Sequence, residues 1–200
     1  MIVQTFINFY LKIFFILTPF FVLSAFISLT KDFDDFEKKR TAIKVTVGVL
    51  ISSFTFYLFG RYIFELFGIT LDAFRIGAGT ILFLSAISMI SDKNDTKNQG
   101  NSRDIAIVPL TMPMTVGPGV IGMLLVTGAE AGALVERCII GLALLLAVLS
   151  VGLILYLSSS VKRLIGKQGL IILPKITGLF VSAIAAQIIF TGIQNFLLLN

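Results

Sequence analysis

The segment TMPMTVGPGV, residues 111–120, contains two prolines and two glycines. Proline and glycine ordinarily interrupt helices and mark turns. Yet the segment lies within an uncharged stretch of 25 residues, 105–129, which is long enough to cross a bilayer as a helix. The sequence therefore places helix-breaking residues inside an expected membrane span, where freed backbone groups must find polar partners.

The composition indicates a membrane location for most of the chain. Hydrophobic residues make up 56% of the 200 residues, charged residues only 14%, and the mean hydropathy is +0.99. Because soluble domains average about 25% charged residues, we predict an all-α, polytopic membrane protein embedded in a lipid bilayer. Basic cytoplasmic loops explain the net charge of +5 better than nucleic acid does, so no nucleic-acid partner is expected.

Catalysis and metal binding are not expected of this sequence. It has no histidine and one cysteine, Cys138, so it lacks the commonest metal ligand and general base and cannot form an internal disulfide. No Asp or Glu lies deep in an uncharged run, which disfavours a proton relay through buried carboxylates. We therefore predict a protein that is not an enzyme and that has no cofactor or metal.

Six uncharged runs predict six transmembrane helices. The two 16-residue runs are shorter than the ~20 residues of a typical span, but flanking Lys and Arg side chains can reach to the interface and extend them. The first run lacks a basic n-region and a cleavage site, so we expect a resident span rather than a secretion signal. The runs cover residues 13–30, 45–60, 76–91, 105–129, 138–161 and 176–200.

The distribution of Lys and Arg predicts the orientation of these helices. The loops after the first, third and fifth runs hold 12 of the 16 Lys and Arg residues. Positive residues favour the cytoplasmic side, so we expect both termini outside, in a bacterial inner (cytoplasmic) membrane. The polar stretch 91–104 is expected to be a cytoplasmic linker between two halves.

The two halves of the sequence resemble each other. Pro19 and Pro118 are 99 residues apart, and RIGAGTILFLSAI from Arg75 resembles KITGLFVSAIAA from Lys175 at a spacing of 100. Three spans per half is an odd number, so the second half must be inverted relative to the first, as in many secondary transporters. We predict two inverted three-helix repeats, 1–90 and 105–200, with discontinuous helices 1 and 4.

The predicted breaks supply the candidate binding residues. A proline inside a helix frees backbone groups, and in a membrane these must be buried in protein or line a polar cavity. Half-helix ends then offer N–H and carbonyl groups to a small zwitterion. A kinked helix with a packing role stays open as the alternative. The candidate substrate-binding residues are Thr18, Pro19, Val22, Pro113, Thr115, Gly117, Pro118, Gly119 and Gln187.

Other polar residues inside the runs are interpreted mainly as hydrogen-bonding groups between helices, Ser85 and Ser88 among them. Gln187 is the largest of these side chains. An amide needs partners when it is buried, which makes Gln187 the best candidate for a ligand contact outside the two breaks.

Three stretches resemble the MarC family of membrane proteins. VPLTMPMTVGPGVI at 108–121 is similar to the family signature of two prolines before a Gly-Pro pair, and residues 71–90 and 178–193 resemble its third and sixth spans. Family members of the SnatA type transport small neutral amino acids. The resemblance implies two inverted three-helix repeats with discontinuous first and fourth helices around a central substrate site.

The first span departs from the family pattern. The family has Asn or Asp before the proline and a Gly-Asn pair after it, whereas this chain has Thr18 before Pro19 and Phe21 and Val22 after it. A carboxylate or amide that could hold an ammonium group or a coupling cation is therefore missing. This half of the site suits a more apolar substrate.

Together these features predict a secondary transporter for a small neutral solute, such as a small amino acid or a related metabolite. Alternating access would occur around the broken helices 1 and 4. A coupling cation and a homo-oligomer stay open as further partners. The alternative is a non-transporting scaffold or regulatory protein that retains the fold.

Overall fold

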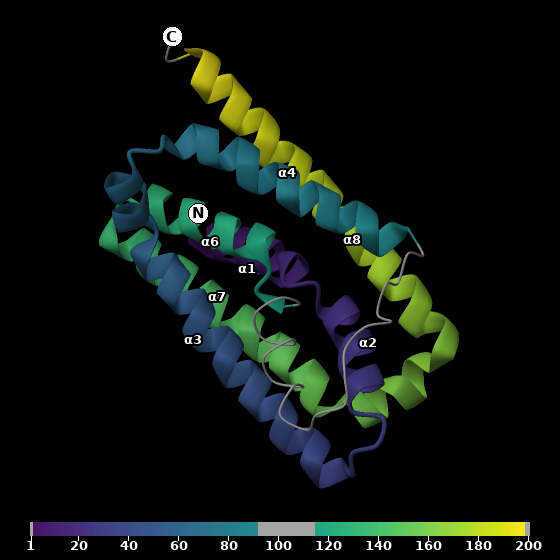
Figure 1. Cartoon of the computed structure of the whole chain (residues 1–200). Helices are drawn as coiled ribbons and strands as arrows, with labels where there is room; N and C mark the ends of the chain where they lie inside the picture. The colour runs from purple at the N-terminus through teal and green to yellow at the C-terminus, as the bar shows by residue number, and fades with distance from the viewer. Residues whose placement is uncertain (1, 92–114, 199–200) are drawn as a thin grey trace.

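The computed structural model describes residues 2–91 and 115–198, and these ranges contain helices and no strand. Figure 1 shows their arrangement. The predicted all-α class is therefore confirmed. The helices are α1 (Ile2–Ile16), α2 (Pro19–Leu29), α3 (Asp35–Phe67), α4 (Leu71–Ile90), α6 (Pro118–Glu130), α7 (Leu134–Tyr156) and α8 (Ser158–Leu198).

Five helical stretches are long and apolar enough to cross a membrane, and α6 is a shorter apolar helix of 13 residues. α6 occupies the second half of the predicted span 105–129, and residues 105–114 lie outside the described residues. Five of the six predicted spans thus overlap such stretches, with shifted ends, and the count of six stays a prediction. The stretches are Val3–Leu29, Asp35–Gly60, Leu71–Ile90, Leu134–Tyr156 and Gln168–Leu198.

The helix boundaries follow local chemistry. Asp34 caps α3 by accepting a hydrogen bond from the Glu37 amide at 2.6 Å, and the Glu37 side chain reaches back to the Asp34 amide. α3 ends at Gly68, whose φ of 60° suits glycine. In α8 the backbone leaves the helical conformation at Gly166, with φ 69°, while Pro174 lies inside the helix.

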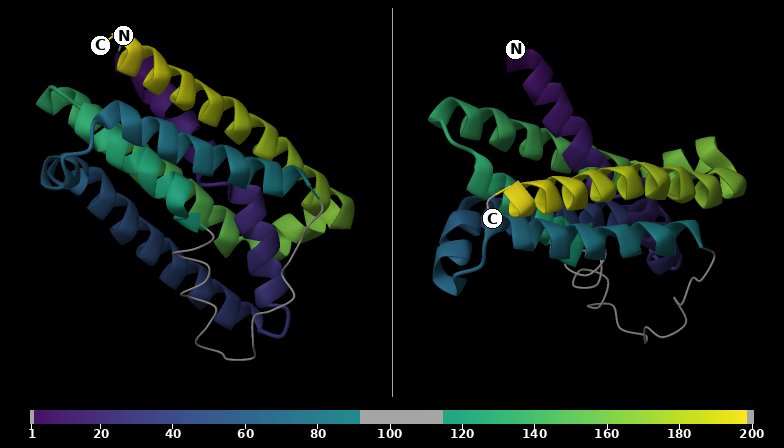
Figure 2. Two further views of the ribbon diagram at one scale, coloured as in Figure 1. Left: turned by 45° about the horizontal axis from the view of Figure 1, so that its top comes forward. Right: turned by 90° about the horizontal axis from the view of Figure 1, so that it is seen from above.

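α6 occupies the centre of the bundle. It packs against α3 and α4, while α4 also packs along α8, and α1 packs against α7. Figures 1 and 2 show α4 and α8 running side by side. Large side chains in the interior include Leu17, Phe26 and Leu144, each less than 2% exposed. The outer surface carries many exposed apolar side chains, such as Phe190 at 71%, as expected for helices that face lipid.

The two ends of the bundle hold different connections. The start of α1, the end of α8 and the loops 68–70 and 131–133 lie at one end (Figures 1 and 2). The α2–α3 and α7–α8 connections, with the adjoining basic residues of 31–44 and 162–163, lie at the other end. Two of the three basic loops thus lie at the same end. The third, 91–104, lies almost wholly outside the described residues, and the orientation stays a prediction.

Candidate functional site

The first helix is interrupted at Thr18, between α1 and α2. Pro19 lacks an N–H and disfavours a helical conformation of the residue before it, so the helix cannot continue through Thr18. Thr18 has φ 49° and ψ 55°. A β-branched residue in this left-handed region costs ~1–3 kcal/mol. Because Thr18 is only 4% exposed, the surrounding packing holds the break in place.

The N-terminus of α2 has backbone donors without helical acceptors. Its first helical hydrogen bond is donated by the Val22 amide to the Thr18 carbonyl, at 3.0 Å. The amides of Phe20 and Phe21 come before this bond and have no acceptor inside the helix. The Thr18 side chain does not cap the helix. The first N–H groups of α2 therefore have neither a helical acceptor nor a cap from Thr18.

The start of α6 has the same construction. Pro118 is its first residue, and the Ile121 amide donates the first helical hydrogen bond to the Gly117 carbonyl at 2.9 Å. Gly117 has an extended backbone, with φ −71° and ψ 173°, and no side chain to cap the helix. The amides of Gly119 and Val120 therefore also lack helical acceptors.

One cavity of about 580 Å³ lies at both helix starts. Ile16, Thr18 and Phe21 line it from the first break, and residues 117–120 line it from α6. None of its described lining residues is ionisable. The remaining lining residues come from α4 and α8 and are Ile81, Leu82, Leu84, Ser85, Ser88, Met89 and Val181.

The cavity combines apolar walls with backbone donors. Two helix N-termini carry partial positive charge and N–H groups without helical acceptors, which suit a carboxylate or another acceptor. The Ser85 hydroxyl donates to the Ile81 carbonyl at 2.8 Å and keeps its lone pairs for a donor. Such a lining suits a small solute that has polar groups but no net charge.

Four candidate residues from the sequence line this cavity together: Thr18, Gly117, Pro118 and Gly119. Pro19 and Val22 are buried in the first turn of α2 and do not line it. Thr115 is fully buried just before α6, and Gln187 is exposed on α8, away from the lining. Pro113 lies outside the described residues. The structure thus brings together the two breaks but not Gln187.

The sequence alone did not identify the wall that α4 supplies. Ser85 and Ser88 were interpreted as groups that join helices, yet both line the cavity. Their spacing of three residues places them on one helix face, and this was the available signal. Phe21 was noted only as a departure from the family pattern, and it lines the cavity as well.

Close packing fixes α6 against its neighbours. A Cβ added at Gly119 would lie 2.9 Å from Leu82 Cα, so the backbones of α6 and α4 approach closely there. Gly122 likewise lies against Ala78, and Gly128 against the Tyr57 carbonyl. Only glycine permits these approaches, and they hold the open N-terminus of α6 at the cavity.

Charged residues join α4, α6 and α8 at the other end of α6. Arg75 forms ion pairs with Asp72 and with Glu130, and the Asn195 amide lies 3.4 Å from the Asp72 carboxylate. Asp72 and Arg75 are each 8% exposed. The sequence indicated no deeply placed acid, and Asp72 is nevertheless buried because α6 and α8 cover the first turn of α4.

Comparisons with known proteins agree on one family. Residues 3–197 match the model of the MarC family integral membrane proteins. Two UPF0056 membrane proteins of Methanocaldococcus jannaschii are 36% and 33% identical to the chain, over 98% and 94% of its length and 98% and 87% of theirs. A UPF0056 membrane protein of Aquifex aeolicus is 29% identical over 96% of the chain and 94% of its own length. No solved structure matches the chain.

Proposed function

Because the chain belongs to the MarC family of integral membrane proteins, we propose that it is a secondary transporter for a small neutral solute, such as a small amino acid or a related metabolite. The observation that carries this proposal is the cavity at which two proline-initiated helices begin. Broken helices whose ends meet at a central site are a recurring feature of secondary transporters.

In this proposal, backbone groups bind most of the polar part of the substrate. The substrate carboxylate accepts hydrogen bonds from the amides at the starts of α2 and α6. Among the last carbonyl groups of α1, those of Ile13 and Phe15 accept hydrogen bonds from the Leu17 and Thr18 amides. The Ile16 carbonyl, at the cavity, receives the substrate ammonium group or a coupling cation. Thr18 adds a hydroxyl, and Phe21 and Leu82 contact the apolar part of the substrate.

Alternating access follows from the proposed repeat. Residues 1–90 and 105–200 form two inverted halves, and the corresponding Pro19 and Pro118 each occupy the first position of a helix. Rocking of one half against the other would expose the cavity to each side in turn. We place the protein in the cytoplasmic membrane with both termini outside, from the distribution of Lys and Arg.

Ligand-dependent stability of the purified protein tests this function. A ligand that binds the folded state at 100 times its Kd stabilises it by ~2.7 kcal/mol, which is about 5–10 °C in melting temperature for a chain of this size. The probes are neutral amino acids and simple amines, added to detergent-purified protein. We expect at least one neutral amino acid to raise the melting temperature.

Two matched variants locate the effect. Ser85→Leu places a larger side chain in the cavity from α4. Thr80→Leu is the control, because Thr80 is on the same helix and its hydroxyl also donates to a backbone carbonyl, but it does not line the cavity. We expect ligand stabilisation to disappear in Ser85→Leu and to persist in Thr80→Leu. If no probe stabilises the wild-type protein, and proteoliposomes accumulate none, the scaffold alternative replaces the transporter.

A further inference from the structure

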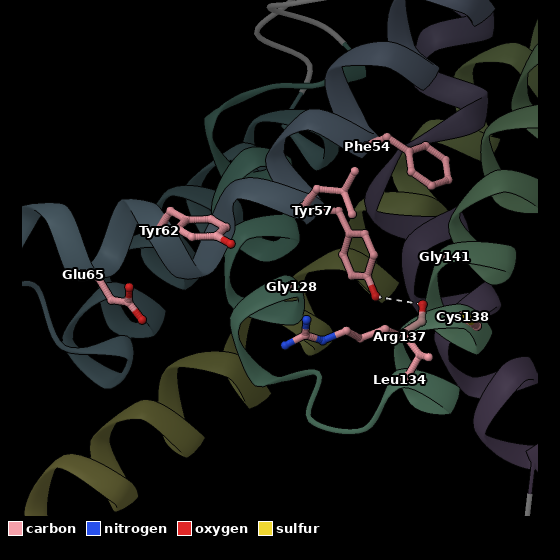
Figure 3. A pocket seen from close by; sticks show the side chains of 10 residues that line it. Phe54, Tyr57, Tyr62, Glu65, Gly128, Leu134, Arg137, Cys138 and Gly141 are labelled. Atoms are coloured by element: carbon pink, nitrogen blue, oxygen red, sulfur yellow. Dashed lines mark hydrogen bonds between the residues drawn. The ribbon is translucent and has the colours of Figure 1, made fainter.

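A second cavity lies outside the proposed transport site, between α3 and α7. Its volume is about 710 Å³, and it contains Arg137 from α7 and Tyr57, Tyr62 and Glu65 from α3. Figure 3 shows the Arg137 side chain extending from α7 to the end of α6 near Gly128. The cavity is next to the loop 131–133 and therefore at the end of the bundle that holds the termini.

Two hydrogen bonds hold Arg137 in place. Its Nε donates to the Ala131 carbonyl at 2.9 Å, and its own carbonyl accepts a hydrogen bond from the Tyr57 hydroxyl at 3.0 Å. The Nε bond uses one of the five N–H donors of the guanidinium. The side chain is thus oriented by its Nε, which leaves its two terminal amino groups, drawn in Figure 3 beside the end of α6, for other acceptors at this cavity.

The cavity continues as an apolar groove along α7. A neighbouring hollow of about 310 Å³ shares Leu134 and Cys138 with it and adds Val135, Ile139 and Leu142. These side chains are largely exposed, Leu134 at 77% and Val135 at 63%. The groove runs from the loop end of α7 into the most apolar candidate span, whose mean hydropathy is 2.9. The cavity with its polar side chains is therefore followed along α7 by an apolar groove, the same order as at a membrane interface.

We propose that this cavity and groove bind a phospholipid, with its phosphate at Arg137 and an acyl chain along α7. A guanidinium binds phosphate oxygens through parallel hydrogen bonds, and these are stronger when both groups are charged. Tyr62 places an amphipathic ring at the polar end, as aromatic residues do at membrane interfaces. The apolar groove has the chemistry and the direction of an acyl chain. This lipid site is separate from the transport cavity and does not depend on the proposed function.

Cys138 provides a built-in reporter for this site. It is the one cysteine of the chain, it is exposed, and it lines both the cavity and the groove. A lipid bound there would cover its thiol. The experiment measures the rate at which a maleimide labels Cys138 in detergent micelles, with added phosphatidylglycerol or with diacylglycerol of the same acyl chains.

We expect phosphatidylglycerol to slow the labelling of the wild-type protein, and diacylglycerol to leave it almost unchanged. Arg137→Gln removes the charge but keeps the Tyr57 bond, which uses the backbone carbonyl. It should weaken the binding of phosphatidylglycerol by about tenfold or more. Arg163→Gln, on an exposed arginine of α8, is the matched control and should keep full protection.

Three outcomes would overturn the proposal. Equal protection by diacylglycerol would make the groove a hydrocarbon site without headgroup recognition. Full protection in a folded Arg137→Gln protein, with folding verified by its melting temperature, would remove Arg137 from the site. Protection by inorganic phosphate alone would replace the lipid with a free anion. Native mass spectrometry gives a second readout, because wild-type protein should retain one more phosphatidylglycerol than Arg137→Gln.

Discussion

The two ends of α6 differ in how their backbone groups are satisfied. At its C-terminal end, Arg75 pairs with Glu130 and with Asp72, and the Arg137 side chain donates to the Ala131 carbonyl. Cations beside a helix C-terminus complement its partial negative charge. At its N-terminal end, Gly117 provides no cap, Pro118 has no N–H, and the cavity adjoins the helix.

This difference is the reason why we propose the N-terminal end of α6 as the binding end. A buried helix end without partners is costly. Among the described residues, side chains bond to the C-terminal end, whereas Gly117 gives the N-terminal end no side-chain cap. The N-terminal end packs closely against α4 through the glycine contacts. In the proposed function, the N–H groups of this end bind the substrate, while the ion pairs of Arg75 fix the position of the helix.

The largest loss of stability should come from disrupting the ion pairs at the C-terminal end of α6. Arg75→Gln leaves the buried Asp72 without its ion pair, and removing one partner of a buried pair costs ~3–5 kcal/mol. Glu130→Gln should cost much less, because the Glu130 side chain is 41% exposed and Arg75 keeps its pair with Asp72. Thermal unfolding in detergent measures both variants. A smaller loss for Arg75→Gln than for Glu130→Gln would contradict this assignment.

The second-largest loss of stability should come from the N-terminal end of α6, where Gly119 packs against α4. Gly119→Ala would place a methyl group 2.9 Å from Leu82 Cα, so α6 must move away from α4, at a cost of ~1–3 kcal/mol. Gly77→Ala is the matched control, because a Cβ at that exposed helical position meets nothing within 4 Å. It should stabilise the protein by ~0.5–1 kcal/mol. Equal melting temperatures for the two variants would mean that α6 and α4 do not pack closely.

Several of the features that position α6 could be predicted from the sequence. Proline chemistry predicted breaks at Pro19 and at Gly117–Gly119, because Pro acts through local geometry. The structure has its interruption at Thr18, next to Pro19, and begins α6 at Pro118. Uncharged runs gave most of the helices, since bilayer thickness fixes their length. The family signature at 108–121 pointed to the same segment of the fourth span.

The long-range contacts could not be predicted in the same way. Ser85 lines the cavity only because Gly119 lets α4 lie against α6, and nothing local to Ser85 encodes that contact. Asp72 is near the end of its helix in the sequence, and its burial depends on α6 and α8. Gln187 attracted attention as a large polar residue in an apolar run, whereas its helical phase leaves it exposed.

The third prediction concerns the hydroxyl of Thr18. Because this hydroxyl does not cap α2, replacing it by a methyl group in Thr18→Val should change stability by less than ~1 kcal/mol. If the hydroxyl contacts the substrate, the variant should bind the stabilising ligand about tenfold more weakly. Thr127→Val is the control: its hydroxyl is buried and bonded to the Met123 carbonyl, and it lies outside the cavity lining. Titrated melting temperatures measure both affinities, and an unchanged affinity in Thr18→Val would exclude the hydroxyl from the site.

The smallest effect on stability should come from capping the open end of α6. Gly117 has an extended backbone that serine also adopts, so Gly117→Ser adds an N-cap and raises stability by only a few tenths of a kcal/mol. The new hydroxyl would accept a hydrogen bond from Gly119 or Val120, the amides that the substrate carboxylate needs. We therefore expect a slightly higher melting temperature together with a weaker response to the ligand. If the interruption before α6 served packing only, Gly117→Ser would raise the stability without changing the response to the ligand. This variant therefore distinguishes a ligand-binding helix end from a structural one.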